Sequence, residues 1–146
     1  MKNSATKIWI HALFGTKDGL PLINETLENR LYTHIKYELD AMHNPIGIIN
    51  GIENHIHILF LLNQGYALKD VIKNVKGESS HWINHNNLSE AKFSWQIGYT
   101  AYSVSESNFK KVETYIANQK LIHKKLSFKE EYKLLMKKHG LPLENR

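Results

Sequence analysis

The sequence predicts an α+β fold in which helices pack against an antiparallel sheet. Short apolar segments rich in β-branched and aromatic residues alternate with longer segments of helical periodicity, in the order strand, helix, strand, strand, helix, strand, helix, helix. The two middle strands are close enough in sequence to pair as a hairpin. With 146 residues the chain can bury a core without cross-links, and the absence of cysteine excludes disulfides and thiolate metal sites.

The first half of the chain supplies three strands and one helix. Residues 6–16, TKIWIHALFGT, are dense in β-favouring residues and predict the first strand. Residues 25–42 carry an apolar residue at every fourth position, which predicts an amphipathic helix. Residues 45–53 and 55–62 are apolar strands. Their hairpin could turn at Asn50-Gly51, but a turn at Glu53-Asn54 keeps both strands longer, and we prefer it.

The second half supplies one strand and three helices. Residues 68–84 share one apolar face and predict a helix, and residues 93–104, FSWQIGYTAYSV, predict the fourth strand. Ser105 is a start signal for a helix that runs to about residue 126. A capping box at residues 127–130 opens a last helix, which ends at Gly140.

This element order is typical of a split βαβ, ferredoxin-like sandwich with helices on one face of the sheet and additional helices at the C-terminus. In that topology the first and third strands are central. The chain has no internal repeat or linker, so we expect a single domain over residues 1–146. The sequence contains neither a signal-peptide pattern nor a membrane-spanning stretch, and we expect a soluble, cytoplasmic protein.

The net charge of +5 is concentrated at the C-terminal end. Residues 1–105 hold nine Lys/Arg and nine Asp/Glu, whereas residues 106–146 hold ten and five. Clustered lysines can be solvated helix faces, or they can form a surface that contacts nucleic-acid phosphates.

The third strand carries two histidines within an apolar run, ENHIHILFLL. Residues two apart in a strand point to the same face, so His55 and His57 lie side by side on what we expect to be an open face. Ile56, Ile58 and Phe60 point to the other face and can pack on helices. Two imidazoles at this spacing can bind a divalent metal, although the pair alone is a weak signal in a chain with nine histidines.

A second motif, YIANQ, lies on the helix after the fourth strand. Tyr115 and Gln119 are four residues apart, so their side chains share one face of that helix. It is the only Tyr-x-x-x-Gln in the chain. The alternative is that Tyr115 packs on the sheet and Gln119 is solvated.

Together and in this order, ENHIHILFLL and YIANQKLIHKKLSFKEEY resemble the single-tyrosine HUH transposases of the insertion sequence 200/605 group and their repeat-associated tyrosine relatives. The resemblance covers nearly the whole chain. It implies a nuclease and strand transferase that acts on single-stranded DNA, often at hairpin ends of a mobile element. It also implies homodimers, in some of which the tyrosine helix serves the partner's site.

By this resemblance His55, His57 and Gln119 would hold a metal, and Tyr115 would be the nucleophile. Two residues depart from the pattern: Asn54 replaces a common Asp, and Ile122 replaces a frequent His beside His123. Neither departure removes a residue that would bind the metal, so they put in doubt only how neighbouring residues adjust the ligands.

The residue types suit phosphoryl transfer with Mg²⁺ or Mn²⁺. A divalent ion neutralises charge that grows on a phosphate oxygen, and Mn²⁺ tolerates imidazole ligands better than Mg²⁺ does. Tyrosine, with a pKa near 10, is both a workable nucleophile and a workable leaving group, so a 5′-phosphotyrosine can be passed to another 3′-OH without ATP. His123 is a candidate general base.

Lysines near these motifs are candidate DNA contacts, although each can equally be solvated: Lys69, Lys73, Lys76, Lys110, Lys111, Lys120, Lys124 and Lys125. Trp82, Trp95, Tyr99 and Tyr102 could stack on unpaired bases, but core positions are the commoner use of such residues.

Three alternatives remain open. Ferredoxin-like sheets also form RNA-binding modules, but those carry aromatic residues on the third strand, where this chain has histidines. His81 and His85 have zinc-binding spacing on a helix, but the Glu of a metalloprotease helix is missing. The chain could also be a catalytically silent or domesticated nucleic-acid-binding protein.

Overall fold

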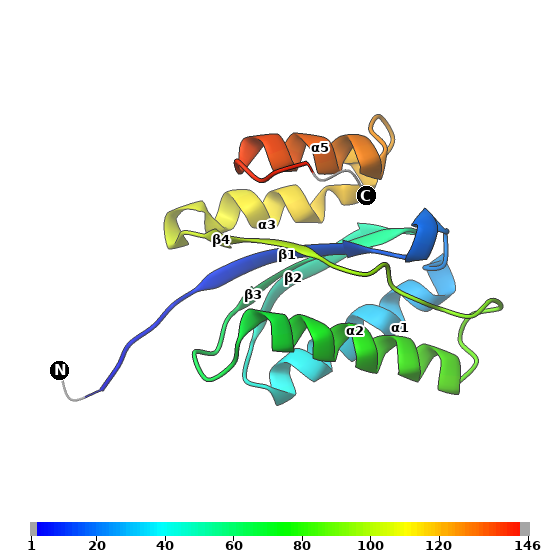
Figure 1. The fold of residues 1–146 in the computed structure, drawn as a ribbon, viewed down its shortest axis with the longest axis horizontal. Coiled ribbons are helices and arrows are strands. Elements are labelled where there is room, and N and C mark those ends of the chain that lie inside the picture. Colours follow the sequence, from blue (N-terminus) through cyan, green and yellow to red (C-terminus); the bar gives the residue numbers. More distant parts are fainter. Residues whose placement is uncertain (1–2, 144–146) are drawn as a thin grey trace.

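The computed structural model describes residues 3–143 and contains a four-stranded sheet with helices on both faces (Figure 1). The elements, in chain order, are β1 (Trp9–Gly15), η1 (Lys17–Gly19), α1 (Glu25–Ala41), β2 (Ile46–Ile52), β3 (His55–Leu61), α2 (Leu68–His85), β4 (Thr100–Val104), η2 (Glu106–Asn108), α3 (Phe109–Ala117), α4 (Gln119–Ile122) and α5 (Phe128–Lys138).

The sheet confirms the expected α+β topology. The strand order is β2-β3-β1-β4 with antiparallel pairing throughout, so β1 and β3 are central. The β2–β3 hairpin turns at Glu53-Asn54, as expected, and pairs Ile52 with His55. Gly51 is required beside this pair because a Cβ atom there would lie 2.0 Å from the His55 carbonyl oxygen.

One face of the sheet builds the main hydrophobic core. Ile56, Ile58 and Phe60 of β3 are buried there together with alternate residues of β1. The helices α1 and α2 cover this face, and α1 contributes the residues that its four-residue periodicity predicts: Leu27, Leu31, Ile35 and Leu39. Strand alternation therefore sends the aliphatic residues of β3 to one side and its histidines to the other.

The other face is covered, and the expectation of an open face around the histidines is wrong. Helices α3 and α5 lie above it in Figure 1, and His55 and His57 are 0% exposed. The cover forms because apolar side chains on this face also need burial: Leu13 packs with Leu135, and Leu59 packs with Ile116.

The fourth strand is shorter than predicted. Only Thr100–Val104 pairs with β1, while residues 93–99 run irregularly, apart from a single bridge between Trp95 and Thr16. In this segment Trp95 turns into the core and donates to Ser79 Oγ at 2.9 Å. Lys76 donates to the carbonyls of Gln96 and Gly98 at 2.6 and 2.7 Å. In this segment, burial of Trp95 and the hydrogen bonds from Lys76 take the place of backbone hydrogen bonds to a neighbouring strand.

The predicted helix over residues 105–126 is also interrupted. It begins with η2, and Asn118 separates α3 from α4. The amide of Asn50 on β2 donates to the carbonyls of Ile116 and Ala117 at 3.0 and 3.2 Å. These bonds take up carbonyls at the end of α3 and hold the break against the sheet.

The last helix, α5, begins with the predicted capping box between Ser127 and Glu130. None of the helices within residues 3–143 has the length and apolar character that crossing a membrane would require.

Candidate active site

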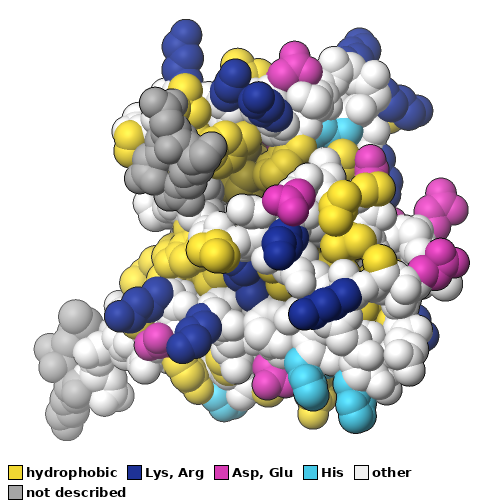
Figure 2. Space-filling view, turned by 45° about the vertical axis from the view of Figure 1, so that its right-hand side comes forward, with side chains coloured by type: hydrophobic (Ala, Val, Ile, Leu, Met, Phe, Trp, Pro, Cys, Tyr) yellow, Lys and Arg dark blue, Asp and Glu magenta, His cyan; other side chains and the backbone are white. Residues whose placement is uncertain are grey.

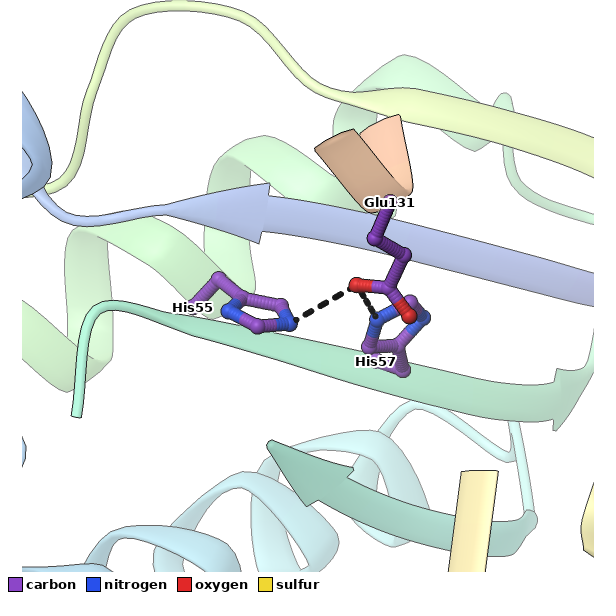
Figure 3. Close-up of side chains that lie close together, drawn as sticks. All are labelled: His55, His57 and Glu131. Atoms are coloured by element: carbon purple, nitrogen blue, oxygen red, sulfur yellow. Dashed lines mark hydrogen bonds and ion pairs between the residues drawn. The ribbon is translucent and has the colours of Figure 1, made fainter. Parts of the chain in front are cut away.

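The two histidines of β3 converge with a carboxylate from α5. In Figure 3 Glu131 reaches down from its helix toward both rings. Its Oε1 lies 3.2 Å from His55 Nε2 and 3.2 Å from His57 Nε2. All three residues are buried, and their ligand atoms lie within 4.8 Å of one another. Among the residues that the structure describes, this is the one such group of three His, Asp or Glu side chains.

Gln119 and His123 complete the cluster. Gln119 Oε1 lies 3.0 Å from His55 Nε2 and 3.0 Å from His123 Nε2. His123 Nε2 is also 3.0 Å from Glu131 Oε1. Three imidazole nitrogens therefore gather around one carboxylate oxygen, and the Gln119 oxygen lies beside two of them.

Each of the three rings also forms a hydrogen bond through its outer nitrogen. The partner of Nδ1 is Asn54 Oδ1 at 3.0 Å for His55, His11 Nε2 at 2.8 Å for His57, and the Leu126 carbonyl at 2.7 Å for His123. A neutral imidazole that donates its Nδ1–H presents an unprotonated Nε2 on its other side.

This donor set fits a divalent cation. When each ring donates its Nδ1–H, the inward Nε2 atoms, Gln119 Oε1 and Glu131 Oε1 present lone pairs that a divalent cation can bind. The distance from Gln119 Oε1 to His55 Nε2 is 3.0 Å, and those from Glu131 Oε1 to the three Nε2 atoms are 3.0 to 3.2 Å. These distances match the roughly 3 Å between adjacent ligands that each stand about 2.1 Å from an octahedral ion. Nitrogen and oxygen donors together suit Mn²⁺ at least as well as Mg²⁺.

Tyr115 joins this cluster from α3. Its hydroxyl donates to Glu131 Oε2, the same oxygen that accepts from Gln119 Nε2 at 2.7 Å. The break at Asn118 therefore does not separate Tyr115 from Gln119, because both remain bonded to one carboxylate. Burial of the phenol, followed by its contact with negative Glu131, raises the pKa of Tyr115 above its ordinary value.

A chain of hydrogen bonds continues behind His57. His11 on β1 contacts His57 through Nε2, and the Tyr102 hydroxyl lies 2.5 Å from His11 Nδ1. His11 is 1% exposed, and burial together with His57 lowers its pKa well below the usual value. His11 thus supports a candidate metal ligand from the neighbouring strand.

Two residues of this site, Glu131 and His11, were not predicted from the sequence. Glu131 stands four residues before Leu135 on the buried face of an amphipathic helix, and an acidic residue on an apolar face is an available signal. His11 occupies the same sheet face as His57 once the strands are paired, which the order of the strands alone could have suggested.

The lysines named from the sequence differ in their surroundings. Lys110 pairs with Glu113 at 2.9 Å, Lys120 contacts Glu28 and Asn50, and the ammonium of Lys76 contacts carbonyls. Lys69 and Lys73 are exposed on α2, on the opposite side of the sheet from Tyr115. Lys111, Lys124 and Lys125 are exposed. Figure 2 shows Lys and Arg side chains over both the upper and lower layers, with acidic groups among them.

The sequence profile of the family described as "Transposase IS200 like" matches residues 4–119. The chain belongs to the IS200-like transposase family. The match includes His55, His57, Tyr115 and Gln119, whereas Glu131 lies beyond it.

Two solved structures share the fold of this transposase. A protein of Deinococcus radiodurans R1, provisionally described as a transposase, is 18% identical, with a TM-score of 0.63 over 82% of this chain and 98% of that chain. A REP-associated tyrosine transposase bound to a REP hairpin is 13% identical, with a TM-score of 0.62 over 84% of this chain and 74% of that chain. Comparison with curated proteins finds no significant match.

Proposed function

We propose that this transposase is a metal-dependent endonuclease and strand transferase for single-stranded DNA, acting as one domain over residues 1–146. Tyr115 is the nucleophile, and His55, His57 and Gln119 hold Mg²⁺ or Mn²⁺. The observation that carries the proposal is Glu131, whose Oε1 faces the histidine nitrogens while its Oε2 accepts the hydrogen bond of the phenol. The nucleophile and the metal donors thus meet in one buried cluster of one chain.

Glu131 adds a charge that the motifs alone did not predict. His55, His57 and Gln119 are neutral donors, and the carboxylate lowers the net charge of the occupied site by one. When bound, the ion would withdraw negative charge from a phosphate oxygen of the DNA.

The chain's own residues perform the covalent step. The Tyr115 oxygen forms a bond to phosphorus, the P–O3′ bond breaks, and the 3′-oxygen leaves and takes up one proton. The phenol proton passes to Glu131, which already accepts the hydrogen bond; we assign the base role to this contact rather than to His123. The product is a 5′-phosphotyrosine, and attack by another 3′-OH reverses the step and joins the strands.

The DNA substrate proposed here is the hairpin end of a mobile element. The REP-associated relative, which shares the fold, is bound to a REP hairpin. Lys110 and Lys111 lie in the first turn of α3, which carries Tyr115, and Lys124 and Lys125 follow α4, which carries Gln119. We propose that these four lysines contact DNA phosphates. Lys69 and Lys73 lie on α2, so they would contact DNA only if the bound DNA strand extends around to that side of the sheet. Lys76 and Lys120 would first have to leave their present partners.

We further propose a homodimer in which each subunit uses its own tyrosine. Tyr115, Gln119 and the three histidines of the cluster belong to one chain, so a partner need not supply the nucleophile. Light scattering with size-exclusion chromatography would measure the mass, and a monomer at micromolar concentration would contradict the dimer.

The proposal is tested by covalent trapping. Single-stranded oligonucleotides from both flanks of the gene are incubated with protein and Mg²⁺ or Mn²⁺, and SDS-resistant adducts are measured. We expect an adduct with wild type and with the control Tyr37→Phe, which changes an exposed tyrosine of α1. We expect none with Tyr115→Phe, and none with His55→Ala or His57→Ala in protein that remains folded by circular dichroism.

Wild type without any adduct, or Tyr115→Phe with as much as wild type, would refute the mechanism. In the first case a silent or domesticated nucleic-acid-binding protein becomes the better description, and DNA binding without cleavage would support it.

A further inference from the structure

A cavity of about 230 Å³ adjoins the nucleophile between β4, α3 and α5. Its lining includes Tyr115 together with Tyr102, Ser103, Asn108, Lys111 and Lys138. The metal-binding candidates themselves are inaccessible, because His55, His57 and Gln119 are 0% exposed and Glu131 is 1% exposed. Tyr115 is only half-buried and forms part of the cavity wall, so the cavity reaches the side chain of the proposed nucleophile.

The charge of the cavity favours a phosphate. Lys111, Lys138 and His139 line it, and no Asp or Glu does. Neither of the two lysines forms an ion pair within 4.0 Å among residues 3–143, whereas the adjacent Lys110 is paired with Glu113. Unneutralised lysines beside a nucleophile attract the backbone of a nucleic acid.

The remaining walls favour a nucleobase. Val104, Val112 and Leu135 are apolar, and the Tyr102 ring stacks on His139 with centroids 3.6 Å apart and planes 19° apart. The volume is smaller than the roughly 300–1,000 Å³ of pockets for drug-sized ligands, and it suits a single base rather than a duplex. Aromatic and apolar walls bind an unpaired base by stacking and burial.

We propose that this cavity binds one unpaired nucleotide next to the scissile phosphate, with its base against the apolar walls and its phosphate toward Lys111 and Lys138. The proposal rests on the proposed function and adds Lys138, Ser103 and Asn108 to the DNA-binding residues. Ser103 and Asn108 supply polar groups that can distinguish one base from another.

The first experiment measures binding without cleavage. Fluorescein-labelled single-stranded oligonucleotides from both gene flanks are titrated with Tyr115→Phe protein, and fluorescence anisotropy is recorded. The double variant Lys111→Gln/Lys138→Gln is compared with Lys133→Gln/Lys137→Gln, which removes the same charge from exposed lysines of α5 outside the cavity. We expect about tenfold weaker binding for the first pair and less than a twofold change for the second.

The second experiment locates the base. Abasic sites are introduced one position at a time, and we expect one position to weaken binding about tenfold, as the loss of one stacked base does. Ser103 is an exposed residue of β4, and Ser103→Trp fills the cavity. In this variant we expect the abasic site at the sensitive nucleotide to cause no further loss of affinity. Melting temperatures verify that the variants fold.

Equal affinities for the two lysine pairs, an abasic penalty unchanged by Ser103→Trp, or no single sensitive position would overturn the cavity proposal. So would failure of the Tyr115→Phe protein to bind any oligonucleotide. Adduct formation by protein with Tyr115 intact is measured in parallel. If adducts form while any of these binding results is obtained, only the cavity proposal is refuted. If no adducts form, the proposed mechanism is refuted.

Discussion

The two oxygens of Glu131 have different partners. Oε1 lies near the Nε2 atoms of His55, His57 and His123, while Oε2 accepts from Tyr115 and Gln119. Burial alone would raise the carboxyl pKa, but the hydrogen bonds with His55 and His57 outweigh it and hold the pKa well below the usual range. Glu131 is therefore ionised at neutral pH, so it can bind a cation and accept the hydrogen bond of the phenol.

Glu131→Gln should impair metal binding and catalysis together. The amide retains the size of the side chain but loses the charge and the proton acceptor. We expect Mn²⁺ affinity to fall about 10- to 100-fold and the rate of adduct formation to fall at least about 100-fold. Calorimetric titration and the trapping assay measure these effects. Glu130→Gln, an exposed neighbour that can still form the capping box, is the matched control. A cleavage rate equal to wild type would rule out the base role.

His11 should act by fixing the orientation of His57. For His57 Nε2 to face a metal with its lone pair, Nδ1 must carry the proton and donate it to His11 Nε2. His11→Phe removes that acceptor and should weaken Mn²⁺ binding about 10- to 100-fold. His11→Gln supplies another acceptor and should retain most of the affinity. Paramagnetic resonance of free Mn²⁺ measures both, and equal affinities in the two variants would contradict the role.

At the scale of elements, the site depends on how β2 holds the break between α3 and α4. Asn50 donates to two carbonyls at the end of α3 and accepts from Lys120 with its oxygen. The side chains of Tyr115 and Gln119 lie on either side of the break. In this way β2 positions Tyr115 and Gln119 against the histidines of β3.

Asn50→Asp separates these two roles because it keeps the acceptor for Lys120 and loses the donor. We expect the free energy of unfolding to fall by about 1–3 kcal/mol, since the carbonyls of Ile116 and Ala117 lose their partner. Urea denaturation measures the change. Asn86→Asp removes one exposed bond to the Trp82 carbonyl and should cost less. An equal or smaller effect at position 50 would mean that the break does not depend on this contact.

At the scale of the whole molecule, the sheet separates two kinds of interior. The face toward α1 and α2 is a hydrophobic core, whereas the face toward α3 and α5 buries polar residues that include His11, His55, His57 and Glu131. Burial lowers the pKa values of His11 and His55, so both rings stay neutral in the folded protein under conditions in which unfolded chains bind protons.

The metal-free protein should therefore lose stability on acidification. Histidines of the unfolded chain take up protons as the pH falls through about 6.5, while His11 and His55 of the folded protein do not until their lowered pKa values are reached. Each contributes a slope of up to about 1.4 kcal/mol per pH unit below pH 6.5. The low pKa of Glu131 acts in the same direction below its ordinary value near 4.5. Urea denaturation in EDTA between pH 5 and 8 measures the slope, and a flat profile would contradict buried neutral histidines.

The sequence by itself determined what depends on local pattern. Alternation in ENHIHILFLL separates the histidines from the core aliphatics, and four-residue periodicity predicts α1. The strand order follows from the succession of elements and a short hairpin. The spacing of Tyr115 and Gln119 survives even a break between them because adjacent turns hold both near Glu131.

Only the tertiary structure decided what depends on packing between distant segments. Glu131 meets His55 and His57 because α5 folds back over the sheet to bury Leu135 with Leu13, and nothing in the local pattern of α5 specifies that docking. The irregular path of residues 93–99 follows from burial of Trp95 and from the Lys76 ammonium, which outweigh β propensity. Periodicity reports which side of an element is buried, and long-range packing decides what that side meets.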